Sequence, residues 1–397
     1  ITQSRKAEEE GAASNENVQE TAPFINLPPP PTLKKSESFS ACLLIKDDNH
    51  WLIEWLAYHY FVMPLRKLIV VIDPESKTSP KNILDRWSSR GLINVTIWTE
   101  KDFMPKKITA NASSFDSNTG LMNHRVRQNN FYRKCIPQAR KAKHKHPWLM
   151  LVDTDEYVLP SYASNHFRNI TQKVPFTKPG SVLRLLKYRQ QVSNGQNNNA
   201  CIYMPRFFFG AKESRRSLVE KDVSSRIGID AANMVTQRFL FREPKRHFNG
   251  KNLINLRELP SIKVFTSVHH VSSFCPDPVK MRGLNQNKHA LLRVHHYLGT
   301  EDQYFFRDDP RAVNMLLNTT SANSDHTSNS SNTASRKEKK LKPKTHHVRD
   351  MTRYNDLNKA AKYEDHAAKG WIRGFIRYMG AETAAELLKD VGVVGVE

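Results

Sequence analysis

Several features are missing from this 397-residue sequence, and each absence disfavours a class of protein. No stretch reaches the ~18 consecutive apolar residues that a membrane-spanning helix needs. No GxGxxG follows the first apolar run and no GxxxxGK[ST] occurs anywhere, which disfavours a Rossmann dehydrogenase and a P-loop NTPase. No CxxC pair occurs among Cys42, Cys135, Cys201 and Cys275, which disfavours a structural zinc site and leaves one or two disulfides possible.

Acidic residues are few compared with basic ones, and the formal net charge is +22. Such a charge first suggests nucleic acid or acidic surfaces as partners. Much of the basic clustering lies in residues 335–347, which look disordered, and the other Lys and Arg residues form no stripe interleaved with aromatics. We therefore expect no nucleic-acid partner. A small polyanion such as a nucleotide diphosphate also fits a basic pocket.

Composition divides the chain into four segments. Residues 1–37 are acidic and then Pro-rich, which predicts a disordered stalk or linker. Residues 318–347 are rich in Asn, Ser and Thr, and they predict a disordered insertion that follows a globular domain at 38–317. In the last segment, 348–397, apolar residues recur at helical spacing, which predicts one or two helices packed on that domain.

The globular domain opens with alternating strand and helix patterns. This alternation predicts an α/β fold with an open, mostly parallel sheet flanked by helices. In such sheets ligands bind beyond the carboxyl ends of the strands, where several acidic residues of this sequence fall. Strands are expected at 39–46, 67–73, 93–99 and 148–153, and helices at 47–62, 81–91 and 124–145.

The stretch HPWLMLVDTDEYVLP (146–160) places a buried strand directly before three carboxylates. Like charges crowded at the rim of an apolar interior are unfavourable unless a cation or donor groups compensate them. Two carboxylates two residues apart, Asp153 and Asp155, can bind a divalent cation that bridges a diphosphate. The sequence therefore predicts a Mg²⁺ or Mn²⁺ site there.

Two other interpretations of this stretch remain open. Asp153 and Asp155 could cap the next helix or pair with nearby Arg and Lys residues. Asp153 could also be a phosphoryl-accepting nucleophile, as in haloacid-dehalogenase phosphatases. Those enzymes carry DxDx[TV] on an early strand, whereas here Tyr157 fills the last position and three strands come first.

Several segments, in consistent order over residues 38–311, together resemble glycosyltransferase family 92 and its relatives in the family 2-like GT-A group. They are SFSACLLIKDDNHWLIEWLAYHY, KLIVVID, RQNNFYRKC, WLMLVDTDEYVLP, MPRFFFGAKES, VTQRFLFR, VHHV and LLRVHHYLGTEDQYFFR. The sequence departs from the family pattern at Asp48, where Glu is usual, at Gln237, which replaces the Glu of E-R-F, and at Val294-His295, which replace I-N. The acceptor-side contacts are therefore the least transferable.

The resemblance implies a GT-A, Rossmann-like fold and a metal-dependent inverting hexosyltransferase. Its donor would be a nucleotide-diphosphate sugar, UDP-galactose being the commonest in the family, and its acceptor a glycan or glycoprotein. The metal ligands would be Asp153, Asp155 and His296, with His295 as the near alternative and His269 and His270 as weaker candidates. The donor would contact Lys46, Asp48, Asp73, Arg127, Gln128 and Asp153, with Lys251 as a further phosphate contact.

An inverting transfer also needs a general base, for which Glu213 is the candidate, because Gly210 lets the chain approach the sugar closely. The chain begins with Ile1, so we expect a longer precursor with an N-terminal membrane anchor and a Golgi or other endomembrane location. The alternative function is a catalytically silent glycan-binding or scaffolding relative of the same fold.

Overall fold

The computed structural model of the protein describes most of the chain. The described residues are 37–105, 120–161, 171, 173–192, 200–213, 218–244, 247–260, 267, 269–271, 273–276, 290–307 and 349–396. The predicted insertion over 318–347 lies outside the described residues, and so does the predicted stalk over 1–37, apart from Glu37.

The N-terminal half of the sheet is parallel, with the strand order β4-β1-β2-β3. These strands are β1 (Phe39–Ile45), β2 (Leu65–Ile72), β3 (Asn94–Trp98) and β4 (Trp148–Met150). Their carboxyl ends meet at one edge of the sheet. Lys46 follows β1, Asp73 follows β2 and Asp153 follows β4, so the predicted donor and metal residues share that edge.

The other half of the sheet is formed by strands from later in the chain. They are β5 (Glu156–Pro160), β6 (Cys201–Phe209), β7 (Phe241–Arg242), β8 (His247–Asn255), β9 (Leu292–Tyr297) and β10 (Tyr363–Glu364). Here β8 lies antiparallel between β4 and β6, β7 lies antiparallel between β6 and β10, and β9 runs parallel to β6 and antiparallel to β5. The prediction of an α/β open sheet is confirmed, with parallel pairing concentrated in its first four strands.

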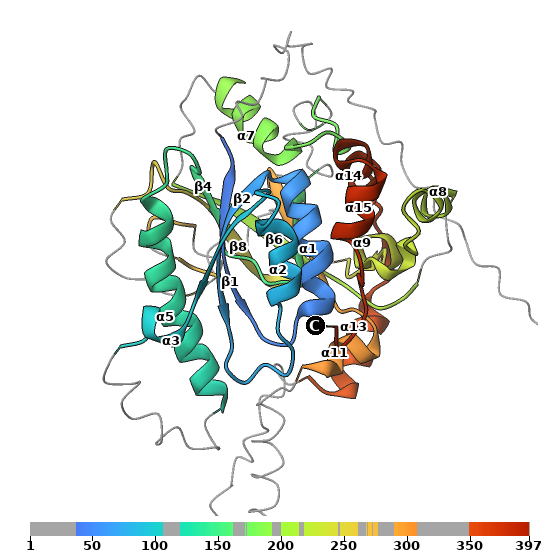
Figure 1. Ribbon diagram of the computed structural model, residues 1–397, viewed down its shortest axis with the longest axis horizontal. Helices are drawn as coiled ribbons and strands as arrows, with labels where there is room; N and C mark the ends of the chain where they lie inside the picture. Colours follow the sequence, from blue (N-terminus) through green and yellow to red (C-terminus); the bar gives the residue numbers. More distant parts are fainter. Residues whose placement is uncertain are drawn as a thin grey trace, which may run out of the picture.

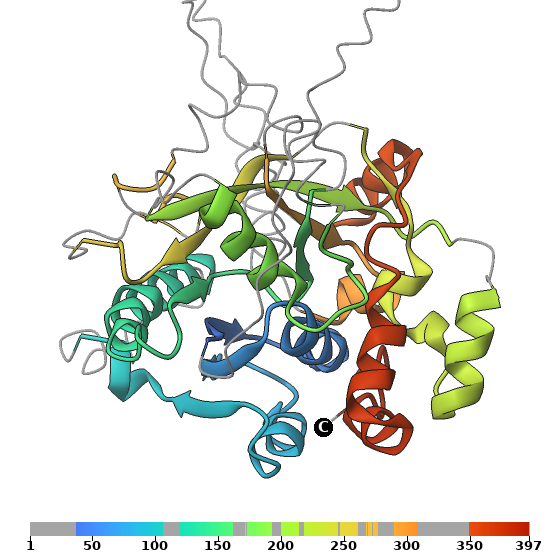
Figure 2. The same cartoon turned by 90° about the horizontal axis from the view of Figure 1, so that it is seen from above.

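Helices cover both faces of the sheet, which curls in the view of Figure 2. They are α1 (Asn49–Val62), α2 (Lys81–Ser88), α3 (Glu100–Phe103), α5 (Gly120–Arg140), α7 (Ser181–Val192), α8 (Leu218–Ile227), α9 (Val235–Arg238) and α11 (Glu301–Phe306). Figure 1 shows α5 on the side of the sheet opposite α1. Successive side chains of β1 point to opposite faces of the sheet. Cys42 belongs to the core cluster that contains Phe131 of α5, and Leu43 belongs to the core cluster that contains α1.

The C-terminal segment contains the helices α13 (Met351–Ala360), α14 (Trp371–Met379) and α15 (Ala381–Leu387). Helix α14 packs against α1, and Trp371 is fully buried in the main core. The Trp371 indole N–H donates to Oγ1 of Thr236 at 2.9 Å, while its ring packs edge-on against Tyr58. The described part of this segment therefore contains three helices, where its apolar spacing predicts one or two.

Two disulfides, Cys42–Cys135 and Cys201–Cys275, use all four cysteines. The first joins β1 to α5, and the second joins the start of β6 to a segment that follows β8. Among the described helices, none combines the length and the apolar character that a membrane span requires. The predicted N-terminal anchor is not tested by this.

Candidate active site

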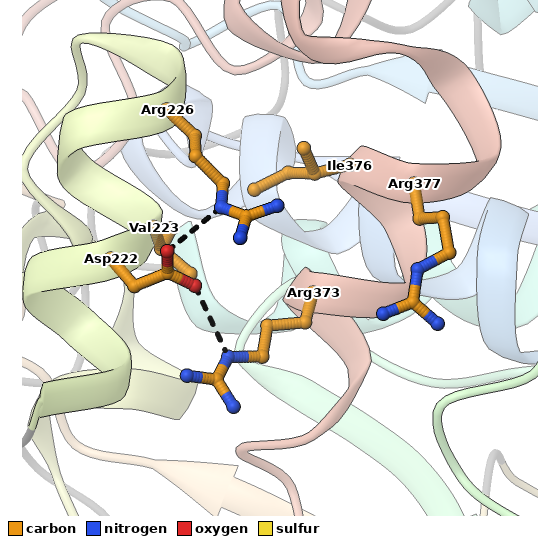
Figure 3. A pocket seen from close by; sticks show the side chains of 6 residues that line it. All are labelled: Asp222, Val223, Arg226, Arg373, Ile376 and Arg377. Atoms are coloured by element: carbon orange, nitrogen blue, oxygen red, sulfur yellow. Dashed lines mark hydrogen bonds and ion pairs between the residues drawn. The ribbon is translucent and has the colours of Figure 1, made fainter.

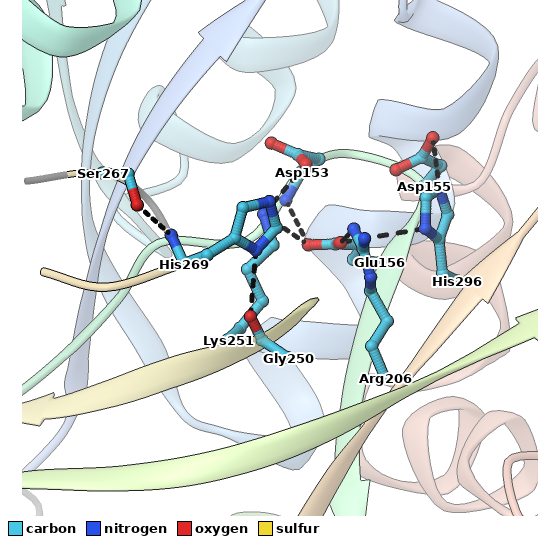
Figure 4. A network of polar contacts seen from close by, with 9 residues as sticks. All are labelled: Asp153, Asp155, Glu156, Arg206, Gly250, Lys251, Ser267, His269 and His296. Atoms are coloured by element: carbon cyan, nitrogen blue, oxygen red, sulfur yellow. Dashed lines mark hydrogen bonds and ion pairs between the residues drawn. The ribbon is translucent and has the colours of Figure 1, made fainter. Parts of the chain in front are cut away.

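The acidic turn after β4 lies beside β9. Strand β5 begins at Glu156 and pairs antiparallel with β9 in a register that sets His296 opposite Glu156. The Nε2 atom of His296 lies 3.1 Å from Oδ2 of Asp155, and the Tyr297 N–H donates to the Asp155 carbonyl at 2.9 Å. The structure thus brings together two predicted metal ligands, Asp155 and His296, that stand 141 residues apart in the sequence (Figure 4).

Two basic residues from neighbouring strands complete this arrangement. The Lys251 ammonium, on β8, donates to Oδ2 of Asp153 at 2.9 Å and lies 3.0 Å from Oε2 of Glu156. The Arg206 guanidinium, on β6, donates to Oε1 of Glu156 at 2.7 Å. Two cations therefore face two of the three carboxylates, Asp153 and Glu156, and offset much of the crowding of like charges. The charged cluster is defined as Asp153, Asp155, Glu156, Arg206, Lys251 and His296 (Figure 4).

The charged groups of this cluster stabilise one another's ionised forms. Burial by itself raises the pKa of Glu156, but Lys251 and Arg206 outweigh burial and hold that pKa well below its ordinary value. Burial lowers the pKa of Lys251, yet Asp153 and Glu156 raise it to a net value above the ordinary one. Burial likewise raises the pKa of Asp155, and His296 more than reverses this effect. Glu156, Lys251 and Asp155 are therefore charged at neutral pH.

Asp155 and His296 offer a carboxylate oxygen and an imidazole nitrogen that are suited to a divalent cation. Oδ1 of Asp155 is buried and has no hydrogen-bond partner within the described residues, and Nε2 of His296 lies against Oδ2 of the same carboxylate. Nδ1 of His296 also has no hydrogen-bond partner within the described residues, but it lies on the Glu156 side of the ring, 3.9 Å from Oε1. Carboxylate oxygen suits Mg²⁺ and Mn²⁺, and imidazole is a common metal ligand. Asp153, whose side chain is 42% exposed, turns toward Lys251 instead. No three His, Cys, Asp or Glu side chains in the described part of the chain are gathered as a metal site, so the cluster offers Asp155 and His296 as a ligand pair.

The predicted donor residues Lys46, Asp73 and Arg127 are linked through a carboxylate that sequence reasoning missed, Glu75. The Lys46 ammonium donates to Glu75 at 2.7 Å, and the Arg127 guanidinium donates to Glu75 at 3.0 Å. Arg127 also donates to Glu100 at 2.6 Å and lies 3.6 Å from Oδ1 of the buried Asp73. Arg127, expected beside a diphosphate, therefore fixes the loop after β2.

Asp48 lies within electrostatic range of the charged cluster. Burial raises the pKa of Asp48, Arg307 at 3.7 Å opposes that rise, and the charge of Asp155 adds to it. Arg349 acts on both carboxylates, because its charge lowers the pKa of Asp48 and of Asp155. Two guanidinium groups, those of Arg307 and Arg349, thus stand near the predicted metal and donor residues.

Gln128 is connected to the cluster through Tyr132. Both residues lie on α5, and the side chain of Gln128 hydrogen-bonds to the Tyr132 hydroxyl. Burial raises the pKa of Tyr132 well above its ordinary value, and the charges of Asp153 and Glu156 raise it further. Gln128 therefore belongs to the layer that surrounds the cluster.

Glu213 stands apart from these residues. Its side chain is 61% exposed and pairs with Arg238, whose Nε donates to it at 3.0 Å. Among the contacts between described residues, none joins Glu213 to the charged cluster. Its role as general base stays a prediction.

The other candidate histidines do not contact Asp155. His295 precedes His296 on β9, points to the opposite face of the sheet and packs against Phe209, with ring centroids 4.2 Å apart. Nδ1 of His269 lies 2.9 Å from the Gly250 carbonyl, and burial, reinforced by Lys251, lowers the pKa of His269 to about 3. The backbone N–H of His270 donates to Ser267.

Sequence reasoning missed the roles of Arg206 and Glu156 and the buried ion pairs of Lys251. The contact of Lys251 with phosphate stays a prediction. A usable signal was present, because Arg206 stands within the apolar run MPRFFF and Lys251 within a strand that ends in LIN. A charged residue inside a strand that is otherwise buried requires a buried partner of opposite charge.

A separate pocket of roughly 240 Å³ lies between α8 and α14, with arginines on both sides (Figure 3). Asp222 on α8 accepts a hydrogen bond from Arg226 at 2.8 Å and lies 3.6 Å from Arg373 of α14. This carboxylate offsets the positive charge and links the two helices. None of the six lining residues belongs to the charged cluster.

Comparison with known proteins points to one family. The model of glycosyltransferase family 92 matches residues 38–337. No curated protein matches the chain. Among solved structures, the chain is similar to S. aureus TarS 1-349 in complex with UDP, with 13% identity and a TM-score of 0.24. That match covers 46% of this chain and 39% of the TarS chain, so the chain spans well under half of that structure.

Proposed function

Because the chain belongs to glycosyltransferase family 92, we propose that it transfers a hexose from a nucleotide-diphosphate sugar to a glycan hydroxyl with inversion. The observation that carries the proposal is the contact between Asp155 and His296 at the carboxyl end of the parallel strands. At this edge of an α/β sheet ligands are bound. UDP-galactose is the first donor to test.

We assign the divalent ion, Mn²⁺ or Mg²⁺, to Asp155 and His296, with Asp153 at the exposed rim of the site. When bound, the ion supplies Lewis-acid stabilisation of the diphosphate leaving group. Lys251 and Arg206 hold Glu156 ionised, and Glu156 in turn accepts the Asp153 N–H at 3.0 Å. These three residues thereby fix the turn that carries the ligands.

The donor is proposed to occupy the edge formed by Lys46, Asp48, Asp73 and the Arg127–Gln128 pair. Asp73 is 1% exposed and accepts the Glu75 N–H at 3.0 Å, so it orders the loop that would meet the nucleotide base. Arg349, which lies outside the sequence motifs, adds positive charge near Asp155, and Arg307 adds positive charge beside Asp48. A diphosphate needs such charge.

We further propose that the protein works in the lumen of the Golgi or another endomembrane compartment, on a glycan or glycoprotein acceptor. The two disulfides support an oxidising compartment, since such bonds are rare in the cytosol.

The test of the proposal combines ion binding with turnover. Calorimetry with Mn²⁺ alone is paired with assays of UDP release from UDP-galactose, with and without a glycan array. Asp155→Asn and His296→Ala should weaken Mn²⁺ binding and lower turnover by at least about 100-fold. Asp356→Asn, at an exposed position of α13, should change neither quantity. Normal turnover in Asp155→Asn at saturating Mn²⁺ would contradict the metal assignment.

The second candidate function is a catalytically silent, glycan-binding relative. It is favoured by the ion pair of Asp153 with Lys251 and by the lack of a three-ligand metal group in the described residues. The same assays separate the two functions. A silent relative binds a glycan on the array but releases no UDP from any nucleotide sugar.

A further inference from the structure

We propose that Glu243 is the general base that deprotonates the acceptor hydroxyl. This inference rests on the proposed function. Glu243 follows β7, and its backbone N–H donates to the Phe208 carbonyl at 2.9 Å. Since Phe209 is paired with Arg242, the antiparallel register sets Glu243 opposite Phe208.

This register places Glu243 in one cross-strand row with the charged cluster. Glu156 lies opposite His296, His296 lies beside Phe208, and Phe208 lies opposite Glu243. Side chains in such a row project from the same face of a sheet. Two contacts confirm that Glu156, His296 and Phe208 share one face: the rings of His296 and Phe208 lie 4.2 Å apart, and Nδ1 of His296 lies 3.9 Å from Glu156.

The row also sets a suitable distance between Glu243 and the metal ligands. One strand, β6, separates β9 from β7, and strands lie about 4.8 Å apart, so the backbones at His296 and Glu243 are roughly 10 Å apart. A donor sugar with its acceptor hydroxyl spans a distance of that order. Phe208, which stands between His296 and Glu243 in the row, is buried, with the His296 ring packed against it.

Glu243 carries no ion pair within the described residues. Asp153, Glu156, Asp48, Asp73 and Glu75 each face a lysine or arginine, and Asp155 faces His296. The previously predicted base, Glu213, pairs with Arg238. An ion pair stabilises the ionised carboxylate and makes it a weaker proton acceptor.

The surroundings of Glu243 make it more basic than an ordinary carboxylate. Its side chain is half-buried, and burial raises its pKa, while Arg353 and His296 reduce that rise without cancelling it. A carboxylate with a raised pKa is a better match for proton transfer near neutral pH.

The chemical step balances with Glu243 in this role. The acceptor oxygen forms a bond to the anomeric carbon of the donor while its proton passes to the Glu243 carboxylate. The bond between the anomeric carbon and the diphosphate oxygen breaks, and its electron pair leaves with the nucleotide diphosphate. Inversion requires the base and the diphosphate to lie on opposite sides of the sugar, as they do when the diphosphate is bound near Asp155.

The test compares Glu243→Gln, Glu243→Asp and Glu213→Gln with the parent protein. UDP-galactose transfer to a glycan array gives kcat, and calorimetry gives the Kd for UDP with Mn²⁺. We expect kcat for Glu243→Gln to fall by about 10²–10⁴-fold, with the Kd for UDP within about twofold of the parent. Glu243→Asp, which keeps the carboxylate, should regain part of the activity. Glu258→Gln, at an exposed turn after β8, is the matched control and should keep parental activity.

Three outcomes would overturn the assignment. Glu243→Gln could keep parental kcat, it could lose UDP binding and transfer together, or Glu213→Gln could lose transfer while Glu243→Gln does not. A parent protein that binds UDP but transfers no sugar from any nucleotide-sugar donor would instead overturn the proposed function, and the base assignment with it.

Discussion

Lys251 is a fully buried cation whose side chain contacts two carboxylates, Asp153 and Glu156. We predict that Lys251→Met lowers the free energy of unfolding by about 3–5 kcal/mol, because Glu156 would keep its charge in the interior with Arg206 as its remaining cation. Urea unfolding followed by circular dichroism measures this change. Lys359→Met, at an exposed position of α13, is the matched control and should stay within about 0.5 kcal/mol of the parent.

A second variant separates charge from packing at this position. If the loss comes from uncompensated charge, the double variant Lys251→Met with Glu156→Gln should regain part of the stability. A double variant less stable than Lys251→Met alone would show that the side-chain stem, and not the charge, accounts for the loss.

At the residue scale, the location of residues at strand ends can be predicted from the sequence alone. Asp153 and Asp155 follow an apolar run, so their place at the edge of the sheet could be predicted from the local pattern. The partners of these residues could not be predicted. Lys251 reaches Asp153 across β4 and β8, and that antiparallel pairing is a tertiary contact that no local pattern specifies. Glu243 was missed for the same reason, because its neighbours lie on β6 and β9.

At the element scale, the pairing of β5 with β9 determines which histidine of β9 lies beside Asp155. A shift of one residue in that register would turn His296 to the opposite face, where His295 now packs against Phe209. The parallel strands β1 to β4 were predictable because each is a continuous apolar run in a strand–helix alternation. The directions of β6, β8 and β9 could not be predicted, because an apolar run does not specify which strand it pairs with.

Helix α14 allows a test of how the C-terminal segment packs against the rest of the protein. A Cβ at Gly374 would collide with the Thr177 carbonyl and lie 2.5 Å from the ring of Phe61 on α1. We predict that Gly374→Ala destabilises the protein by about 1–3 kcal/mol, because backbone and core must shift, which outweighs the gain of about 1 kcal/mol from the better helix former. Thermal and urea unfolding measure the change.

The control for this variant lies one helical turn earlier. A Cβ at Gly370 would meet the methyl group of Thr177 at 3.4 Å, which is close to ordinary contact. Gly370→Ala should therefore leave stability within about 0.5 kcal/mol of the parent. Equal losses in both variants would contradict the close packing of α14 on α1.

At the scale of the whole molecule, stability should depend on pH through histidines that are buried without charge. Burial lowers the pKa of His50 and of His59 to about 3, and burial aided by Lys67 lowers that of His146 to about 4. In the unfolded chain a histidine titrates near pH ~6.5, so below that pH the unfolded state binds more protons than the folded state. Each of these histidines therefore removes up to about 1.4 kcal/mol of stability per pH unit as the pH falls from about 6.5 toward 4.

Carboxyl groups with a raised pKa have the opposite effect, and Glu54 is the clearest example. Burial raises the pKa of Glu54 to about 7, against the donors that it meets at Val235 and Thr236. Between its unfolded value near 4.5 and about 7, Glu54 binds a proton in the folded state alone, so its contribution to stability falls as the pH rises. With His269 and His295, five described histidines have a lowered pKa, against three carboxyl groups with a raised pKa, Asp48, Glu54 and Glu243. The histidines outweigh the carboxyl groups, which gives a net loss of stability on acidification.

We therefore predict that the urea midpoint falls steadily as the pH is lowered from about 6.5 to about 4.5. His59→Gln should make this fall less steep, because the unfolded chain then takes up about one proton fewer relative to the folded state. His59 is suited to the test because it is fully buried on α1, where its Nδ1 lies 2.9 Å from the Trp55 carbonyl. The matched control, His144→Gln, replaces an exposed histidine and should leave the slope unchanged. Equal slopes in His59→Gln and the parent would show that His59 takes up a proton in the folded state, contrary to its burial. A slope that changes in His144→Gln as well would trace the pH dependence to unfolded-state charge instead of to the buried histidines.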